Sequence, residues 1–288
     1  MNEMKLKSGT DVRGTAMGPS PLMTTDIARR LGYVFARMTA HRAGKTPAEV
    51  TLAIGRDSRI TGPALLQATA EGAALTGASV LDFGLCTTPA MYMSLVAPGF
   101  QVDSSIMVTA SHHPSDKNGL KFFLPSGGIS SDDVTELLQT ATSLQLTESS
   151  SRGAITPCQF LPEYKKMLAE RIRKGLDTDV PKPLLGLHVV VDAGNGAGGF
   201  YTELLEEMGA WVEGSQFLDP DGRFPNHIPN PENKEAMESI AHAVVEHTAD
   251  LGVIFDTDCD RAAIVDSDGR EINRNRLIAL IAAVLLDE

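Results

Sequence analysis

The sequence predicts an α/β protein made of two similar three-layer α/β domains with mixed, mainly parallel sheets. Short apolar runs with strand character alternate with helical patterns along most of the 288 residues. Such alternation is typical of sheets covered by helices through right-handed crossovers. The chain is also longer than most single domains. Both halves open with the same strand–loop–helix–strand order, although the residues themselves show no repeat.

Local signals predict the elements of the first half. Short apolar runs between turn residues indicate strands, whereas apolar residues at helical spacing between a polar cap and a glycine indicate helices. Strands are expected at 50–54, 79–83, 106–108 and 121–124, and helices at 64–75, 88–96 and 132–144. An Asn-Gly pair at 118–119 predicts a turn before the last of these strands.

Residues 147–157, TESSSRGAITP, are small and polar and end in proline, which is typical of a linker. Domain 1 is therefore expected to span 1–150 and domain 2 to span 151–271. The second half is expected to have helices at 160–174, 199–208 and 232–247 and strands at 187–191, 211–217, 251–255 and 262–265.

Residues 272–288 are expected to begin a third domain, which is truncated in this sequence. The last segment, EINRNRLIALIAAVLLDE, forms a helix whose final turns are apolar nearly all round. A helix of this kind needs burial on most of its circumference, so further C-terminal domains are expected in the native protein.

Composition excludes several classes of function. The formal net charge of −12 argues against partners such as nucleic acids or anionic membranes, which need a basic surface. The three cysteines are far apart, which suits a reducing cytoplasm. The longest apolar run, 277–286, is shorter than the roughly 20 residues of a membrane span, and the N-terminus lacks a signal peptide. We expect a cytoplasmic protein.

An acidic loop between two apolar strands, LGVIFDTDCDRAAIVD, is the first candidate site. Asp256, Asp258 and Asp260 point roughly the same way if the backbone is extended, and their charges repel one another. A hard divalent cation such as Mg²⁺ relieves that repulsion. An EF-hand does not fit, because its sixth and twelfth positions would be Arg261 and Ser267. The remaining alternative is a solvated acidic turn.

A glycine-rich segment, VVVDAGNGAGG, matches the dinucleotide-binding pattern through Gly194, Gly196 and Gly199. Asp192 stands at the mouth of this loop, where a pyrophosphate would have to approach. We therefore favour a structural interpretation, in which the glycines allow close packing of strand and helix. A dinucleotide site is the alternative.

The segment TASHHPSDKNGLKFF combines a serine, two histidines and a lysine. Ser111 follows a strand and is placed at its carboxyl end, where open α/β sheets bind ligands. A catalytic triad is disfavoured, because a histidine next to the serine in sequence is poorly placed as its base. A phosphoryl-carrying serine fits better, with Lys121 as an electrostatic or acid–base group. Taken alone, the loop is equally compatible with an ordinary polar turn.

Two basic clusters suit an anionic substrate. The segment GTDVRG contains Arg13, and GRDSR contains Arg56 and Arg59 on either side of Asp57. We interpret Arg59 as a substrate-binding candidate. The alternative for each cluster is a structural Arg–Asp pair.

Together these motifs resemble the α-D-phosphohexomutases, the phosphoglucomutase/phosphomannomutase family. The resemblance depends on GTDVRG, GRDSR, TASHHPSDKNGLKFF, DAGNGAG, FPNHIPNPEN and DTDCDR, in family order. The catalytic residues that it implies are Ser111, which is phosphorylated, His112, Lys121 and Arg13, with Arg261 binding substrate. The implied Mg²⁺ ligands are Asp256, Asp258, Asp260 and the phosphate on Ser111.

The resemblance also implies a reaction. The family moves a phosphoryl group between O1 and O6 of a hexose phosphate, with one Mg²⁺ per active site and a hexose 1,6-bisphosphate as intermediate and activator. Family members have four domains, of which this chain would hold the first two and the opening helix of the third. It departs from the family at His113, where Asn is usual, and at Thr257 and Cys259, where Gly is usual.

Two other functions stay open at this point. Asp256 with Asp258 is similar to the Asp-x-Asp signature of phosphatases that use an aspartyl nucleophile. The chain is also compatible with a truncated, non-catalytic paralogue that acts as a binding module.

Overall fold

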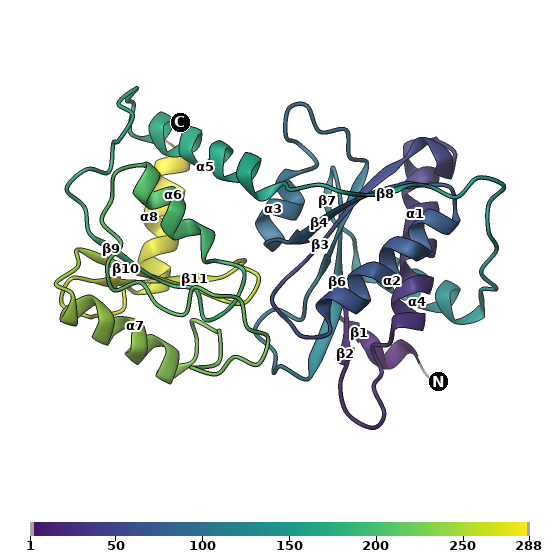
Figure 1. Ribbon diagram of the computed structural model, residues 1–288, viewed down its shortest axis with the longest axis horizontal. Coiled ribbons are helices and arrows are strands. Elements are labelled where there is room, and N and C mark those ends of the chain that lie inside the picture. The colour runs from purple at the N-terminus through teal and green to yellow at the C-terminus, as the bar shows by residue number, and fades with distance from the viewer. Residues whose placement is uncertain (1–2, 287–288) are drawn as a thin grey trace. The chain divides into compact units, whose positions relative to one another are not determined.

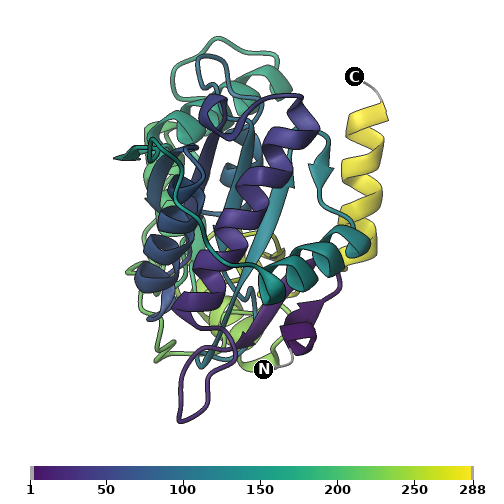
Figure 2. The same cartoon turned by 90° about the vertical axis from the view of Figure 1, so that its right-hand side faces the viewer.

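The computed structural model describes residues 3–286. The chain divides into two compact units, Met1–Lys166 and Met167–Glu288, which are described one at a time (Figure 1 and Figure 2). No helix in the described part of the chain is long and apolar enough to cross a membrane.

The first unit is built on a mixed sheet in the order β1-β2-β6-β5-β3-β4-β8, with β7 paired to β6. The strands β3, β4, β5 and β8 are parallel neighbours, whereas β2 and β6 are antiparallel additions at one side. The strand bounds are β1 Lys7–Ser8, β2 Asp11–Thr15, β3 Thr51–Arg56, β4 Ser79–Leu85, β5 Ser104–Val108, β6 Lys117–Leu124, β7 Gly127–Gly128 and β8 Ile155–Pro157.

Helices cover both faces of this sheet. Figure 1 shows α1, α2 and α4 on one face and α3 on the other, which gives the three layers predicted from the sequence. Short 3₁₀ turns, η1 Glu3–Leu6 and η2 Pro47–Glu49, precede β1 and β3. The helix bounds are α1 Thr25–Ala43, α2 Gly62–Leu75, α3 Thr88–Met93 and α4 Ser131–Ser143.

Helix α1 was not anticipated from the sequence, although its signals are present. Thr24 caps its first turn, and Gly44 ends it in the left-handed conformation with φ 66°. A Cβ on Gly32 would lie 2.1 Å from the carbonyl oxygen of Thr69 in α2. Glycine therefore lets the backbones of α1 and α2 approach closely, which aligns α2 over the sheet.

The turn expected at Asn118-Gly119 is wrong, because both residues lie inside the continuous strand β6. A Cβ on Gly119 would lie 2.1 Å from the carbonyl oxygen of Val12 in the neighbouring strand. The glycine is needed for close strand packing. The asparagine is fully buried, and its amide donates to Thr61 Oγ1 at 2.9 Å.

The segment expected to be a linker contains an edge strand. Ile155–Pro157, strand β8, pairs in parallel with β4, so the first sheet continues past residue 150. Gly153 allows this approach, since a Cβ there would lie 1.8 Å from the carbonyl oxygen of Ala78. Proline at the end of an edge strand is tolerated because its missing N–H is not required for pairing.

The second unit has a smaller sheet in the order β11-β10-β9, with β9 parallel and β11 antiparallel to β10. Helix α7 covers one face, and α5 and α6 cover the other (Figure 1). A compact core of Val190, Ile240, Val244, Ile254 and Val265 lies under α7. The bounds are α5 Leu161–Gly175, β9 Val189–Asp192, α6 Phe200–Glu207, α7 Lys234–Glu246, β10 Leu251–Phe255, β11 Ala262–Asp266 and α8 Arg274–Leu286.

The strand expected at 211–217 does not form. Only isolated bridges remain, from Trp211 to His188 and from Gln216 to Asp192. Between them the chain turns at Gly214, which has φ 85°. The turn interrupts the alternation of side chains between the two faces that a strand needs. The apolar residues of this segment therefore did not indicate a continuous strand.

Helix α8 forms as expected, and it has no buried residue among those described. Its apolar side chains remain exposed, with Ile278 at 63% and Leu280 at 62%.

Candidate active site

The backbone of Ser111 adopts an unusual conformation. Strand β5 ends at Val108, and Ser111 follows with φ 54°, in the left-handed region that L-residues rarely adopt. Its side chain is 1% exposed, and its Oγ lies 3.3 Å from Nδ1 of His112. Its N–H donates to Thr109 Oγ1 at 2.8 Å. The predicted nucleophile is therefore held at the carboxyl end of a buried strand.

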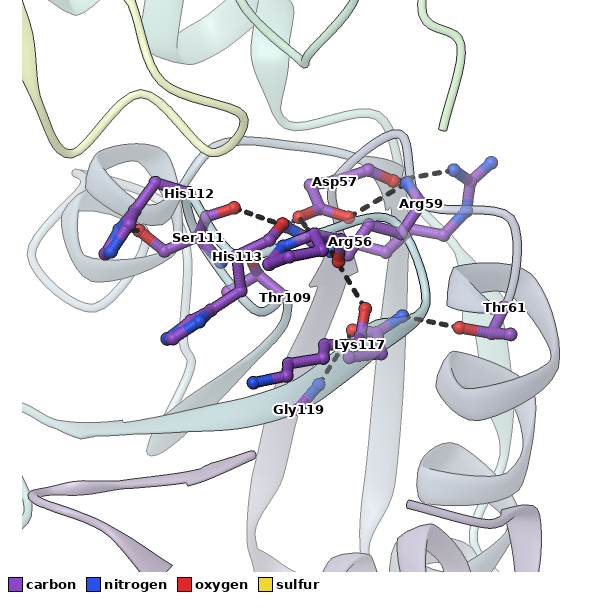
Figure 3. A network of polar contacts seen from close by, with 12 residues as sticks. Arg56, Asp57, Arg59, Thr61, Thr109, Ser111, His112, His113, Lys117 and Gly119 are labelled. Carbon is purple, nitrogen blue, oxygen red and sulfur yellow. Dashed lines mark hydrogen bonds and ion pairs between the residues drawn. The ribbon is translucent and has the colours of Figure 1, made fainter. Parts of the chain in front are cut away.

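Arg59 lies beneath this loop and is fully buried (Figure 3). Its Nε donates to the carboxylate of Asp57 at 3.2 Å. Its four terminal N–H groups have the backbone carbonyls of Ser111, His113, Pro114 and Lys117 as acceptors.

The substrate-binding interpretation of Arg59 therefore needs correction, and the structure fits the alternative of a structural Arg–Asp pair. All five N–H donors of its guanidinium have acceptors within the protein. A substrate phosphate would have to displace them from a site with no exposed surface. The structure makes Arg59 a residue that holds the serine loop.

Arg13 and Lys121 share one face of the sheet. Arg13 in β2 pairs with Gly119 of β6, and Lys121 lies two residues further along β6, so both side chains point the same way. A Cβ on Gly119 would lie 2.9 Å from Cγ of Arg13, so the glycine leaves space for the arginine. Lys121 is 6% exposed.

The Nε–H group of Arg13 is a hydrogen-bond donor that remains available to an acceptor. Its Nη2 lies 2.5 Å from Asp11 Oδ2. Its Nε is buried and has no hydrogen-bond partner among residues 3–286. A buried donor without an acceptor is costly, and an anion bound on this face would supply one.

His113, the departure from Asn, remains uncharged near neutral pH. Burial, followed by the positive charges of Arg13, His112, Lys117 and Arg59, lowers the pKa of His113 to about 4. Its ring stacks on His112 with centroids 4.9 Å apart. One neutral polar side chain has therefore replaced another beside the serine.

The three aspartates lie close together in the loop between β10 and β11. Asp256, Asp258 and Asp260 each place a carboxylate oxygen within 4.8 Å of the others, and the first two side chains are fully buried. Three carboxylates at this spacing repel one another, and a cation relieves the repulsion. An all-oxygen donor set suits Mg²⁺, so these residues fit the ion that the sequence predicts.

The glycine-rich loop packs against this acidic loop. The N–H of Ala197 donates to the carbonyl of Thr257 at 2.9 Å, and a Cβ on Gly196 would lie 2.6 Å from the same oxygen. Gly194 lies against Pro229 in the same way. Protein atoms therefore fill the spaces that Gly194 and Gly196 open, so a pyrophosphate has no room in this loop. The structural interpretation of the glycines fits, and the dinucleotide site does not.

The two departures in the acidic loop have different consequences. Cys259 has φ 61°, in the left-handed region where glycine is favoured. Thr257 is fully buried, and its Oγ1 has no hydrogen-bond partner within the described residues. The loop therefore tolerates both side chains at some cost in backbone strain and polar burial.

Arg261 follows the aspartates and reaches solvent. Its side chain is 41% exposed and lies 3.7 Å from Glu232, whereas its N–H donates to Asp256 Oδ1 at 3.1 Å. Its backbone thus orients a metal-ligand candidate, and its guanidinium is accessible to a substrate.

Some contacts that hold these loops were not anticipated from the sequence. Thr109 bonds to Asp57 beneath Ser111, and Asp192 is fully buried in the second unit. Asp192 accepts hydrogen bonds from His227 Nε2 at 2.9 Å and Gln216 Nε2 at 2.7 Å. Thr109 is 52 residues from Asp57, and His227 and Gln216 are 35 and 24 residues from Asp192, so no local spacing could have indicated these contacts.

The structure thus gathers Ser111, His112, Arg13 and Lys121 around the end of β5 in the first unit. It gathers the three aspartates and Arg261 in the loop between β10 and β11 in the second. The two groups belong to different units.

Comparison with known proteins gives consistent matches along the chain. The family model described as phosphoglucomutase/phosphomannomutase, alpha/beta/alpha domain I, matches residues 4–147, and the model for alpha/beta/alpha domain II matches residues 162–269. A phosphoglucosamine mutase from Corynebacterium jeikeium is 34% identical over 284 residues, which cover 96% of this chain and 60% of that protein.

Two further relatives agree. A phosphomannomutase/phosphoglucomutase from Pseudomonas syringae is 35% identical over 239 residues, covering 83% of this chain and 48% of that protein. A solved structure of a phosphoglucomutase/phosphomannomutase family protein from Burkholderia thailandensis has a TM-score of 0.84 at 29% identity, covering 100% of this chain and 60% of that one. The chain thus spans 48% to 60% of the length of these relatives.

Proposed function

Because this chain belongs to the phosphoglucomutase/phosphomannomutase family, we propose that it is the phosphoserine- and metal-binding part of a phosphohexomutase. The observation that supports this most is Ser111, which is buried at the end of β5 with φ 54°. The buried acidic loop in the second unit supplies the donor set for Mg²⁺. Such an ion would neutralise part of the phosphoryl charge.

The proposed reaction only exchanges P–O bonds. The phosphoryl group on Ser111 passes to a free sugar hydroxyl, which gives a hexose 1,6-bisphosphate and an unmodified serine. The phosphoryl group at the other end of the sugar then returns to Ser111. In the first step the proton lost by the sugar hydroxyl is replaced by protonation of the leaving serine oxygen, and in the second step the serine hydroxyl loses a proton while the leaving sugar oxygen gains one.

The side chains near Ser111 suit these proton and charge movements. Nδ1 of His112 is 3.3 Å from the serine Oγ, within reach of a proton transfer once the substrate is bound. We propose His112 and Lys121 for proton transfer and Arg13 for stabilising phosphoryl charge. The exposed guanidinium of Arg261 is the proposed substrate contact.

The proposed substrates are hexose 1- and 6-phosphates, with a hexose 1,6-bisphosphate as activator. The relatives are named for glucosamine, glucose and mannose phosphates, and all three sugars stay candidates here. Because the chain spans 48% to 60% of those relatives, we propose that further C-terminal domains complete the substrate site. The domain bounds 1–150, 151–271 and 272–288 stay predictions, although strand β8 at Ile155–Pro157 belongs to the sheet of the first unit. A cytoplasmic location stays a prediction.

Phosphorylation of Ser111 is the direct test. The chain is incubated with glucose 1,6-bisphosphate and Mg²⁺, and intact-mass and peptide mass spectrometry locate the added phosphate. We expect one phosphate on Ser111, its loss in Ser111→Ala, and its retention in the matched control Ser115→Ala.

Other outcomes identify the alternatives. Trapping by beryllofluoride at Asp256 with Ser111→Ala still active would indicate an aspartyl phosphatase. Absence of any phosphorylated residue, both in this chain and in a chain extended by C-terminal domains, would contradict the proposed function and favour a binding module.

A further inference from the structure

We propose that Arg59, together with Asp57 and Thr109, is a positioning unit that holds Ser111 in its left-handed backbone conformation. The consequence for phosphoryl transfer rests on the proposed function, whereas the conformational claim does not. Both peptide groups that flank Ser111 are fixed. Its N–H donates to Thr109 Oγ1 at 2.8 Å, and its carbonyl accepts from Arg59 Nη2.

Four backbone carbonyl oxygens of the serine loop point toward the guanidinium of Arg59. The carbonyls of Ser111, His113, Pro114 and Lys117 all accept from its terminal nitrogens. Figure 3 labels three of these residues, Ser111, His113 and Lys117, near Arg59. Carbonyl dipoles that point toward one spot repel one another unless a cation lies there. A planar guanidinium supplies five donors in a fixed arrangement, which the single ammonium of lysine does not reproduce.

Asp57 links the two halves of this unit. Its carboxylate accepts from the backbone N–H of Arg59 at 3.0 Å and from Nε at 3.2 Å. It also accepts from Thr109 Oγ1 at 2.6 Å. The hydroxyl of Thr109 therefore donates its hydrogen bond to Asp57, and its oxygen accepts the hydrogen bond from the N–H of Ser111.

The arrangement explains how a serine is kept at φ 54°. L-residues disfavour this region because Cβ approaches the following carbonyl oxygen, and such conformations persist where the surroundings fix them. Arg59 and Asp57 are both fully buried, so they act through Ser111 and not by touching substrate. They are positioning residues, and their removal should release the backbone of the serine.

A four-variant stability cycle tests the conformational claim without any catalysis. Ser111→Gly and Ser111→Ala are compared in the wild-type background and in Arg59→Lys, and the folding equilibrium constant is measured by denaturant unfolding. Glycine adopts the left-handed conformation without a steric penalty. In the wild-type background, the folding equilibrium constant of Ser111→Gly should therefore be roughly two- to tenfold larger than that of Ser111→Ala. In Arg59→Lys this preference should vanish or reverse, because alanine regains an ordinary φ.

Two further variants keep the test decisive. Arg56→Lys is the matched control, since Arg56 is half-buried and its Nη1 donates to the carbonyl of Asp57; it should preserve the glycine preference. Thr109→Val removes the acceptor for the N–H of Ser111. If Arg59→Lys does not fold, the same cycle is measured in the Thr109→Val background. An equal glycine preference in the wild type and in the variant that is used would overturn the proposal.

The catalytic arm uses phosphorylation of Ser111 by glucose 1,6-bisphosphate. The maximal rate should fall about 100-fold in Arg59→Lys, the loss expected from misplacing a reacting group. The half-saturating concentration should stay unchanged, because Arg59 does not contact the bisphosphate. A wild-type rate in Arg59→Lys would overturn the proposal. A wild-type chain that is not phosphorylated would count against the proposed function, and the stability cycle would still decide the conformational claim.

Discussion

Three arginines of the candidate site, Arg13, Arg59 and Arg261, differ in burial and in hydrogen-bond partners. Arg59 is fully buried with all five donors accepted by protein oxygens, whereas Arg13 retains a buried Nε without a partner among the described residues. Arg261 keeps a guanidinium that is 41% exposed. The same residue type thus holds a loop, offers a donor to an anion, or reaches solvent, depending on what surrounds it.

A buried ion pair holds the loops of the second unit. Burial alone lowers the pKa of His227, but the hydrogen bond and charge of Asp192 and the carbonyl of Ile228 outweigh it and raise that pKa above its usual value. Both ring nitrogens face acceptors, as in an imidazolium. The pair's stabilisation is therefore full below the unfolded pKa of about 6.5 and is lost as pH rises through the folded pKa.

Replacement of His227 by glutamine should destabilise the protein in a pH-dependent way. The expected loss is about 2–4 kcal/mol near pH 6, because Asp192 is left buried without its cationic partner. The loss should be smaller near pH 9 than near pH 6, because the charged fraction of His227 in the wild type falls as the pH rises. Denaturant unfolding at both pH values measures the difference.

His242 provides the matched control. It lies on α7 with a side chain 79% exposed, 3.4 Å from Glu246. His242→Gln should change the free energy of unfolding by less than about 0.5 kcal/mol at either pH. An equal loss for His227→Gln at both pH values would contradict the raised pKa.

At the scale of the elements, α8 is more apolar than α7, yet α7 is the helix that packs into a core. Ile240 of α7 is fully buried against the sheet, whereas the described residues of α8 include no buried side chain. Apolar residues stabilise a fold only in proportion to the area removed from water. The two helices should therefore respond very differently to substitution.

Ile240→Ala should cost about 2–4 kcal/mol of unfolding free energy, because it leaves a cavity in the core. Leu280→Lys in α8 should change that free energy by less than about 0.5 kcal/mol. Urea unfolding of both variants checks this. A loss above about 2 kcal/mol for Leu280→Lys would mean that α8 is packed in this chain.

The sequence predicted most elements, and two of its three errors share a cause. Helix α1 was overlooked, the strand at 211–217 was wrong, and the Asn118-Gly119 turn was wrong. The last two depend on tertiary contacts, since Gly119 is required by a neighbouring strand and Gly214 interrupts an apolar run. Pattern and turn rules describe local preference, which such contacts override.

At the scale of the whole molecule, the sequence indicated candidate chemical groups but few of the contacts that support them. Ser111 and the three aspartates stand out because their chemistry is visible in a short motif. The contacts Thr109–Asp57 and His227–Asp192 join residues 52 and 35 positions apart. The burial of Arg59, which its motif does not reveal, decides between the two interpretations of that residue in favour of a structural Arg–Asp pair.

Magnesium should stabilise the second unit through the acidic loop. Saturation to about 100 times the dissociation constant adds about 2.7 kcal/mol to the free energy of unfolding. Asp258→Asn should abolish this effect and stabilise the metal-free protein, because it removes repulsion between buried carboxylates. Thermal unfolding with Mg²⁺ and with EDTA measures both. A metal-free Asp258→Asn protein less stable than wild type would contradict the repulsion.

We propose, as the family resemblance implies, that phosphorylated Ser111 is a further ligand of the divalent ion for which Asp256, Asp258 and Asp260 supply the donors. The measurement is ³¹P electron–nuclear double resonance on protein carrying phosphoserine at position 111, with Mn²⁺ in place of Mg²⁺. We predict a ³¹P hyperfine coupling typical of a directly bound phosphate, which disappears in Asp258→Asn. Mn²⁺ bound to the aspartates without any ³¹P coupling would contradict the account.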